Sequence, residues 1–271
     1  MSGLPSSWQV PDLPPFDHLL QAENFLPLVG VIIFFQLLAV VIRQTLWNQF
    51  EGFKQYRLRN LTICFLHSCF CGLWVLTFFL THTKIMFTDP VFYFEPWMKW
   101  VLLVTVGYFI HDTIDMFKFE ISRWTLELLL HHLATGFVMS VAITGKRFTV
   151  YAYWALLMEV NSIFLHMRTL FLLSGNRDLY TKTFDVIKLL NILTFVVFRF
   201  AVQVWQIHFV VVYREHFHFF YFACGFFGGL FFLVTNLLLF FRVLAADGFL
   251  GEFGRKHAAI NRDEQKTKKH F

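Results

Sequence analysis

The chain has 271 residues and a formal net charge of +5, with 57% hydrophobic and only 15% charged residues, whereas soluble domains carry about a quarter charged residues. Its 38 phenylalanines and mean hydropathy of +0.56 leave too much apolar surface for a soluble domain of this size to bury. The composition therefore indicates an integral membrane protein, and it excludes a nucleic-acid binder because the basic residues flank apolar runs and form no stripe.

The first 25 residues are predicted to form a polar arm. They hold four of the seven prolines and no Lys or Arg, so they lack the basic start of a secretory signal peptide. A bilayer core needs about 20 apolar residues of helix. Seven segments are long enough, and they predict an all-α membrane protein with about seven spans: 26–46, 61–81, 97–117, 124–144, 148–172, 184–212 and 219–243.

Only a few residues separate the fourth and fifth segments. They form a tight helical hairpin if both cross the membrane, and one long kinked element is the alternative. We expect residues 50–245 to form the main domain, after the first span at 26–46, and residues 246–271 to form a basic tail.

The Lys and Arg residues orient the chain. With the N-terminus outside, 17 of the 23 would lie in cytosolic loops and in the tail, while Arg199 lies within a span. The other five would lie outside: Lys84, Lys99, Lys146, Arg147 and Arg214. This asymmetry predicts an external N-terminus, a cytosolic C-terminus and an odd number of spans.

Six consecutive spans each carry a polar residue at a similar depth. A polar residue inside a membrane span costs free energy, so its presence there suggests a functional role. With about 1.5 Å of rise per residue, each lies about 9–10 Å from the cytosolic end of its span. The pattern predicts that spans two to seven form a bundle around a polar cavity open to the cytosol, with the first span peripheral. The six residues are His67, His111, His131, His166, Asn191 and Asn236.

Helical spacing groups further polar residues on shared faces. His111, Asp112 and Asp115 fall within a wedge of about 100°, and the short loop that follows predicts that they face His131 and His132.

Glu127 lies four residues before His131 and is expected on the same face. Glu159, Ser162 and His166 share a second face, and Arg199, Gln203 and Gln206 share a third. Because Glu159 and Arg199 both lie near the membrane midplane, we expect them to form an ion pair.

These residues allow several interpretations. A histidine oriented by a carboxylate could act as a general base or carry an acyl group; the same residues could bind a lipid headgroup, or simply hold the helices together. A metal held by His111, Asp115, His131 and His132 is a further alternative, but membrane di-iron enzymes need more histidines, so no metal and no cofactor is predicted. The four cysteines lie in apolar runs and are interpreted as small hydrophobic residues.

The motifs of this layer resemble those of the TLC-domain family, named after TRAM, Lag1 and CLN8, over about residues 50–245. The resemblance lies in Gly107-Tyr108-Phe109-Ile110-His111-Asp112-Thr113-Ile114-Asp115, in Glu127 with His131-His132, in Glu159-Val160-Asn161-Ser162-Ile163-Phe164-Leu165 and in His67-Ser68. It is strongest to the animal subfamily of TLC domain-containing proteins 1 and 2. That subfamily implies a regulator of membrane fluidity at the cell membrane that limits incorporation of long-chain polyunsaturated fatty acids into phospholipids.

Ceramide synthases share this family's fold and are similar at His111-Asp112-x-x-Asp115 and His131-His132, but this chain lacks the longer Lag1 motif. The first hypothesis is therefore a lipid-binding regulator whose polar layer holds a phospholipid headgroup or acyl-CoA. The alternative is an acyltransferase that uses His131 or His132 with His111, Asp112 and Asp115, and a third class is a structural scaffold or channel regulator. The sequence is also compatible with a homo-oligomer. The dilysine-like end Lys268-Lys269-His270-Phe271 makes the endoplasmic reticulum an alternative location to the cell membrane.

Overall fold

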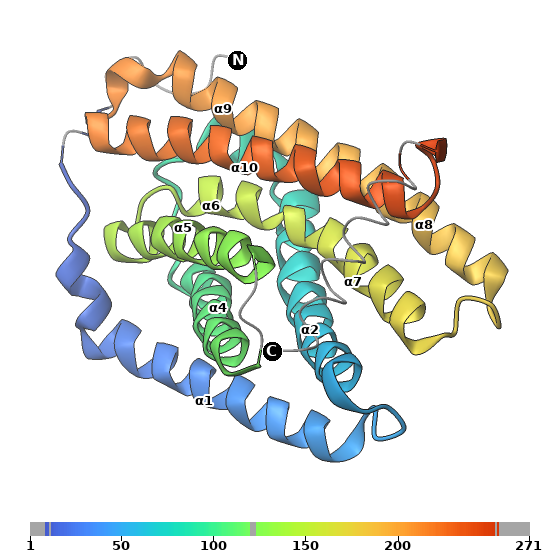
Figure 1. Cartoon of the computed structure of the whole chain (residues 1–271). Coiled ribbons are helices and arrows are strands. Elements are labelled where there is room, and N and C mark those ends of the chain that lie inside the picture. The colour runs from blue at the N-terminus through green and yellow to red at the C-terminus, as the bar shows by residue number, and fades with distance from the viewer. Residues whose placement is uncertain (1–8, 11, 120–122, 253, 255–271) are drawn as a thin grey trace.

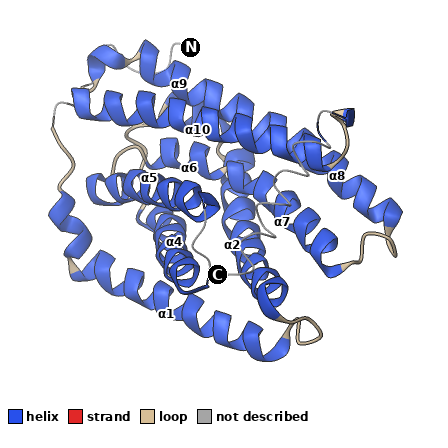
Figure 2. Cartoon of the chain, viewed as in Figure 1, coloured by secondary structure: helices blue, strands red, loops and turns tan. Residues whose placement is uncertain are grey.

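The structure is a computed structural model that describes residues 9–10, 12–119, 123–252 and 254, and the elements in this part of the chain are helices (Figures 1 and 2). The long ones are α1 (Ala22–Thr45), α2 (Gly52–Thr81), α4 (Lys99–Phe119), α5 (Arg123–Gly145), α6 (Thr149–Leu156), α7 (Met158–Ser174), α8 (Thr181–Phe195), α9 (Val202–Val212) and α10 (Phe219–Ala246). The short ones are η1 (Phe16–Leu20), α3 (Thr83–Thr88), η2 (Pro96–Met98), η3 (Val196–Ala201) and η4 (Arg214–His216). The predicted basic tail from residue 255 onward, with its dilysine-like end, lies outside the described residues.

Six helices in the described residues are long and apolar enough to cross a membrane, which confirms an all-α membrane protein. They are Ala22–Thr45, Gly52–Thr81, Pro96–Phe119, Leu126–Gly145, Thr149–Ser174 and Phe219–Ala246. The remaining predicted span, 184–212, is also helical, but a π-helical segment, η3, separates α8 from α9. The segment 184–212 is therefore not one continuous α-helix.

The fourth and fifth predicted segments are separate helices. The chain leaves α5 at Gly145 and enters α6 at Thr149. Between them Lys146 and Phe148 have φ angles of 48° and 61°, a left-handed conformation that non-glycine residues seldom adopt and that cannot continue a right-handed helix.

The helices differ in how much of their surface the protein buries. In the most apolar window of each span, 67% of the residues are buried for Pro96–Phe119, against 22% for Ala22–Thr45 and 11% for Phe219–Ala246. Helix α4 packs against α1 and α5, α2 packs against α7, and α9 packs against α10. Figure 1 shows α1 and α10 at opposite edges of the bundle, in agreement with the small part of each that is buried. Helix α4 is therefore a central helix, and α1 and α10 are peripheral.

The N-terminal arm packs on the end of the bundle where α5 ends and α10 begins. The Val10 backbone N–H donates to the His216 carbonyl at 2.8 Å, and the His218 N–H donates to the Val10 carbonyl at 2.8 Å. Phe16 of η1 contacts Phe137 of α5 and Phe220 of α10, with ring centroids 6.0 and 5.9 Å apart. The part of the arm that the structure describes thus covers this end of the helices.

Gly72 allows the backbones of α2 and α7 to approach closely. A Cβ at this position would lie 3.0 Å from the backbone carbon of Glu159 and 3.1 Å from the backbone nitrogen of Val160. Small residues permit such contacts between membrane helices, where packing supplies much of the association energy.

Replacing Gly72 by alanine is expected to lower the free energy of unfolding by about 1–3 kcal/mol, the usual cost of overpacking, because neither backbone atom can move aside alone. Gly30→Ala on α1 is the matched control, since no atom lies within 4 Å of a Cβ there. Reversible unfolding in detergent measures both variants. Equal stability of the two would contradict the close α2–α7 contact.

Candidate functional site

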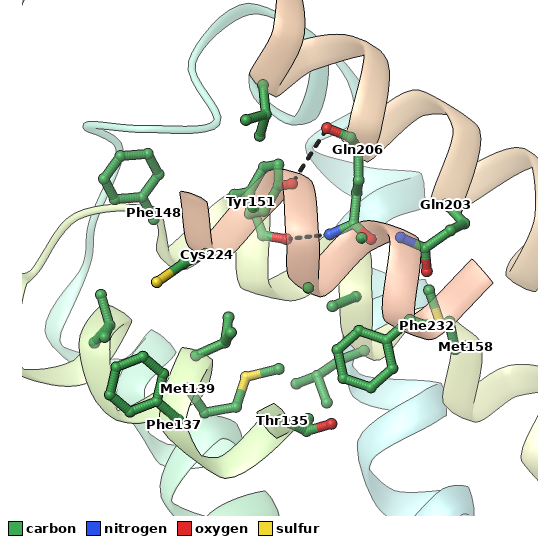
Figure 3. Close-up of a pocket in the computed structure, with 18 of the residues that line it drawn as sticks. Thr135, Phe137, Met139, Phe148, Tyr151, Met158, Gln203, Gln206, Cys224 and Phe232 are labelled. Carbon is green, nitrogen blue, oxygen red and sulfur yellow. Dashed lines mark hydrogen bonds between the residues drawn. The ribbon is translucent and has the colours of Figure 1, made fainter. Parts of the chain in front are cut away.

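A cavity lies between α5, α6, α7, α9 and α10 (Figure 3). Its volume is about 140 Å³, whereas a single water needs about 10–15 Å³, so the cavity has room for a molecule much larger than water. Among the described residues, α4 lines the cavity only with Phe109, and no residue of α2 lines it. The cavity is therefore displaced toward α10 from the centre of the predicted six-helix arrangement.

One end of the cavity is formed by apolar and aromatic side chains. In Figure 3, Phe148, Phe137 and Cys224 lie at this end, away from Gln203 and Phe232. The ring of Phe148 stacks on Tyr221 at 4.8 Å between centroids. We call this region the apolar end and define it by Phe137, Val141, Phe148, Val210, Phe217 and Tyr221.

The other end carries polar and charged groups. From Phe232, whose ring lies 5.3 Å from His131, to Tyr221 the cavity follows α10 over about 16 Å, at 1.5 Å of rise per residue. It is therefore long and has unlike ends, as a binding site for an amphiphile requires. We call this second region the polar end and define it by His131, Thr135, Glu159, Ser162, Arg199 and Gln203.

Arg199 connects three helices at the polar end. It lies in the π-helical segment η3, a type of irregularity often found at functional sites. Its Nε donates to Asn161 at 2.6 Å, its Nη1 to Asn236 at 2.9 Å and its Nη2 to Ser162 at 2.9 Å. Asn161 also donates to the backbone carbonyl of Asn191 on α8, at 2.9 Å. Four of the predicted polar residues thus belong to one hydrogen-bonded network.

Glu159 has different partners. Its Oε2 accepts a hydrogen bond of 2.6 Å from the hydroxyl of Ser68 on α2. Among the described residues Arg199 bonds neutral side chains instead, so the predicted Glu159–Arg199 ion pair is wrong. The hydroxyl of Ser162, one helical turn after Glu159, accepts the hydrogen bond from Nη2 of Arg199. The Nε and Nη1 of Arg199 donate to Asn161 of α7 and Asn236 of α10. The two opposite charges line the same cavity separately.

Asp112 and His132 meet between α4 and α5. The Asp112 Oδ2 lies 3.7 Å from the His132 Nε2, and Asp112 Oδ1 accepts a bond of 2.6 Å from Asn60. The His132 ring stacks on Phe109 at 4.5 Å. His132 is 5% exposed and does not line the cavity, whereas its neighbour His131 does. The histidine paired with a carboxylate and the histidine at the cavity are therefore different residues.

His111 points away from this pair. Its ring stacks on Phe35 of α1 at 6.0 Å, and within the described residues neither of its ring nitrogens has a hydrogen-bond partner. Asp115 is buried on the same helix. Successive helical residues point about 100° apart, so Asp112 faces α5 while His111 faces α1. The expectation that the whole His111-Asp112-x-x-Asp115 motif faces His131-His132 therefore holds for Asp112 alone.

Three further predicted polar residues, His67, His166 and Glu127, lie away from the cavity lining, whereas Gln206 is part of it. His67 stacks on Tyr108 at 3.8 Å, and its Nε2 lies 3.3 Å from the sulfur of Cys71. His166 is half-buried on α7 and is not among the lining residues. Glu127 is bonded to Arg242 of α10 at 2.9 Å, and its side chain is 49% exposed. The structure thus corrects the expectation that Glu127 belongs to the buried layer, because its face of α5 turns toward α10 and the surroundings at this point.

Two polar residues of the site were not singled out from the sequence. Thr135 lines the cavity one turn after His131, and a threonine inside an apolar helix gives no distinctive signal. Asn161 stands beside the predicted Ser162, and only the position of Arg199 shows its role. In the described residues no group of three or more His, Cys, Asp and Glu side chains is arranged to hold a metal.

Comparison with known protein families matches residues 57–245 to the TLC domain of the TRAM, LAG1 and CLN8 proteins. TLC domain-containing protein 2 of Danio rerio is 29% identical over 193 residues, 71% of this chain and 77% of that protein. TLC domain-containing protein 1 of Gallus gallus is 34% identical over 163 residues, 60% of this chain and 63% of that protein.

TLC domain-containing protein 2 of Mus musculus is 33% identical over 148 residues, 55% of this chain and 47% of that protein. No solved structure matches the chain. The family match covers more than half of the chain, including the helices that form the cavity. The chain therefore belongs to the TLC-domain family of membrane proteins.

Proposed function

We propose that the protein binds an acyl chain in the cavity and thereby regulates the acyl-chain composition and the fluidity of the membrane. The cavity supports this proposal, because it joins an apolar end to a polar end inside a membrane bundle. Ligand sites are typically apolar clefts with a few polar groups that fix orientation. By resemblance to the TLC domain-containing proteins 1 and 2, the effect would be to limit incorporation of long-chain polyunsaturated fatty acids into phospholipids.

The geometry favours binding over acyl transfer. A catalytic histidine needs its carboxylate partner and its substrate within reach at once. Here Asp112 faces His132, which does not line the cavity, and His131 lines the cavity with Phe109 and Phe232 as ring neighbours. The acyltransferase alternative requires His131 to act without the Asp112 carboxylate.

Filling the cavity tests the proposal. Gly228 lines it, and no atom lies within 4 Å of a Cβ built there, so Gly228→Leu adds a side chain at the cavity wall whose first carbon meets no neighbour. Cells that lack the protein would receive the wild type, Gly228→Leu or Gly30→Leu at matched levels, and phospholipid acyl chains would be profiled. Gly30 on α1 also has no atom within 4 Å of a Cβ and is exposed, so it controls for adding a leucine to a helix.

We expect wild type and Gly30→Leu to lower the share of polyunsaturated chains in phospholipids, and Gly228→Leu to leave that share close to the level of the null cells. Full restoration by a folded Gly228→Leu protein would refute a role for the cavity. His131→Ala adds a test of the alternative: the acyltransferase mechanism expects this variant to lose all function, whereas binding expects it to keep part.

We also propose that the N-terminus lies outside and the C-terminus in the cytosol, at the cell membrane. The excess of Lys and Arg in one set of loops supports this orientation, and the resemblance supports the location. A C-terminal epitope that antibodies reach in intact cells would contradict the orientation. Retention in the endoplasmic reticulum that is relieved by Lys268→Ala/Lys269→Ala would instead assign the protein to that compartment.

A further inference from the structure

We propose that the polar end of the cavity recognises a zwitterionic headgroup, a primary ammonium joined to a phosphate, on the lipid whose acyl chain enters the apolar end. This inference rests on the proposed lipid-binding function and names the class of lipid. The separate placement of Arg199 and Glu159 in one cavity is the observation that leads to it.

Each of these two charges forms its hydrogen bonds only with neutral groups among the described residues, and Glu159 acts on Arg199 only from a distance. Arg199 is 7% exposed, and its three hydrogen bonds go to Asn161, Ser162 and Asn236. Glu159 accepts its bond from the Ser68 hydroxyl. A charge inside a membrane protein is costly unless an opposite charge is close. A ligand with both charges supplies a counter-charge to each residue.

The two residues are held at a spacing that suits such a ligand. Ser162 follows Glu159 by one turn of α7, and its hydroxyl accepts the bond from Arg199 Nη2 at 2.9 Å. Residues three apart on a helix have Cβ atoms about 5–6 Å apart. Glu159 is thus a near neighbour, on the same face of α7, of the serine that Arg199 bonds, and both charged residues line one cavity. An ammonium two carbons from a phosphate suits two opposite charges placed in this way.

The available donors and acceptors favour a primary ammonium. A guanidinium has five N–H donors, and the three hydrogen bonds of Arg199 leave two for phosphate oxygens, which it binds well. Gln203 and Thr135 line the cavity, and their buried Oε1 and Oγ1 atoms have no hydrogen-bond partner in the described structure. A rotation of either side chain would turn its oxygen to a primary ammonium, which has N–H groups to donate. A quaternary ammonium has no N–H to donate.

The test measures binding of single-chain probes to the purified full-length protein by competition with radiolabelled oleoyl lysophosphatidylethanolamine. Competitors with the same chain are lysophosphatidylcholine, lysophosphatidic acid and oleate. We expect the wild type to bind lysophosphatidylethanolamine about tenfold more tightly than each competitor, as one charge-assisted hydrogen bond would give. Diacyl phosphatidylethanolamine in nanodiscs is added as a further competitor to identify the kind of lipid that binds. If it displaces the radiolabelled probe, the ligand is an intact phospholipid; if it does not, the ligand is a single-chain lipid.

Glu159→Gln is the decisive variant, because an amide oxygen can still accept from Ser68 while the charge is lost. We expect it to bind lysophosphatidylethanolamine about tenfold more weakly and to keep its affinity for lysophosphatidic acid. Glu127→Gln is the matched control, since it removes a carboxylate of α5 that pairs with Arg242 outside the cavity, and it should behave as the wild type.

The outcomes separate this inference from the function on which it rests. Equal affinity of the wild type for all four oleoyl probes would overturn the headgroup preference and leave acyl-chain binding standing. An unchanged preference in a folded Glu159→Gln protein would overturn the role of Glu159. Failure of every probe to bind would overturn both proposals.

Discussion

Replacing Arg168 by leucine is expected to lower the free energy of unfolding by about 3–5 kcal/mol, the usual cost of leaving one member of a buried ion pair without its partner. Arg168 of α7 bonds Asp247, which directly follows α10, and the two side chains are 6% and 2% exposed. Its Nε donates to the two carboxylate oxygens at 2.9 and 3.0 Å, and its Nη2 also donates to Oδ1. This two-pronged pair holds the end of α10 against α7.

Denaturation in mixed detergent micelles measures the effect, and two further variants test its cause. Arg168→Leu/Asp247→Leu should recover most of the lost stability, because no charge is then left buried alone. Lys188→Leu should cost less than about 1 kcal/mol, as for most exposed pairs, because its partner Asp185 is 59% exposed. A double variant as unstable as the single one would show that the pair contributes packing and not charge compensation.

Replacing Arg199 by methionine is expected to lower the free energy of unfolding by about 2–5 kcal/mol. The substitution leaves the side-chain oxygens of Asn161 and Asn236 without the donors that now bond them, and each unsatisfied buried polar group costs about 1–3 kcal/mol. Arg199→Lys should also destabilise, because a single ammonium cannot reproduce the planar guanidinium that bonds α7 and α10 together.

The same denaturation assay distinguishes lost hydrogen bonds from lost volume. In Arg199→Met/Asn236→Leu the orphaned oxygen of Asn236 is removed, and part of the lost stability should return, since replacing both partners by apolar groups is often nearly neutral. If this double variant is as unstable as Arg199→Met, the orphaned oxygen of Asn236 is not a cause.

Helix content could be predicted from the sequence, because it depends on residues close together in the chain. Apolar runs of about 20 residues can satisfy their backbone groups in lipid only as helices or closed barrels. The polar residues of six spans also lie in the helices expected, and four of them are buried inside the bundle: His67, His111, Asn191 and Asn236.

The side-chain pairing could not be predicted, because it depends on the rotation of each helix and on its neighbours. Glu127 and His131 share a helical face, yet Glu127 bonds Arg242 of α10 and His131 lines the cavity. Arg168 and Asp247 are 79 positions apart, and nothing near either residue indicates the other. The π-helical segment that places Arg199 contains neither Pro nor Gly, so the sequence gives no sign of it.

The most direct test of the account locates a bound acyl chain. An oleoyl lipid with a photoreactive diazirine at the chain terminus would be cross-linked to the purified full-length protein, and the labelled residues mapped by mass spectrometry. If the acyl chain lies in the cavity, the labels fall at the apolar end, chiefly on Phe148, Phe217 and Tyr221, and they are lost in Gly228→Leu. Labels confined to exposed residues of α10 such as Phe219, Phe227 and Leu237, unchanged in Gly228→Leu, would contradict it.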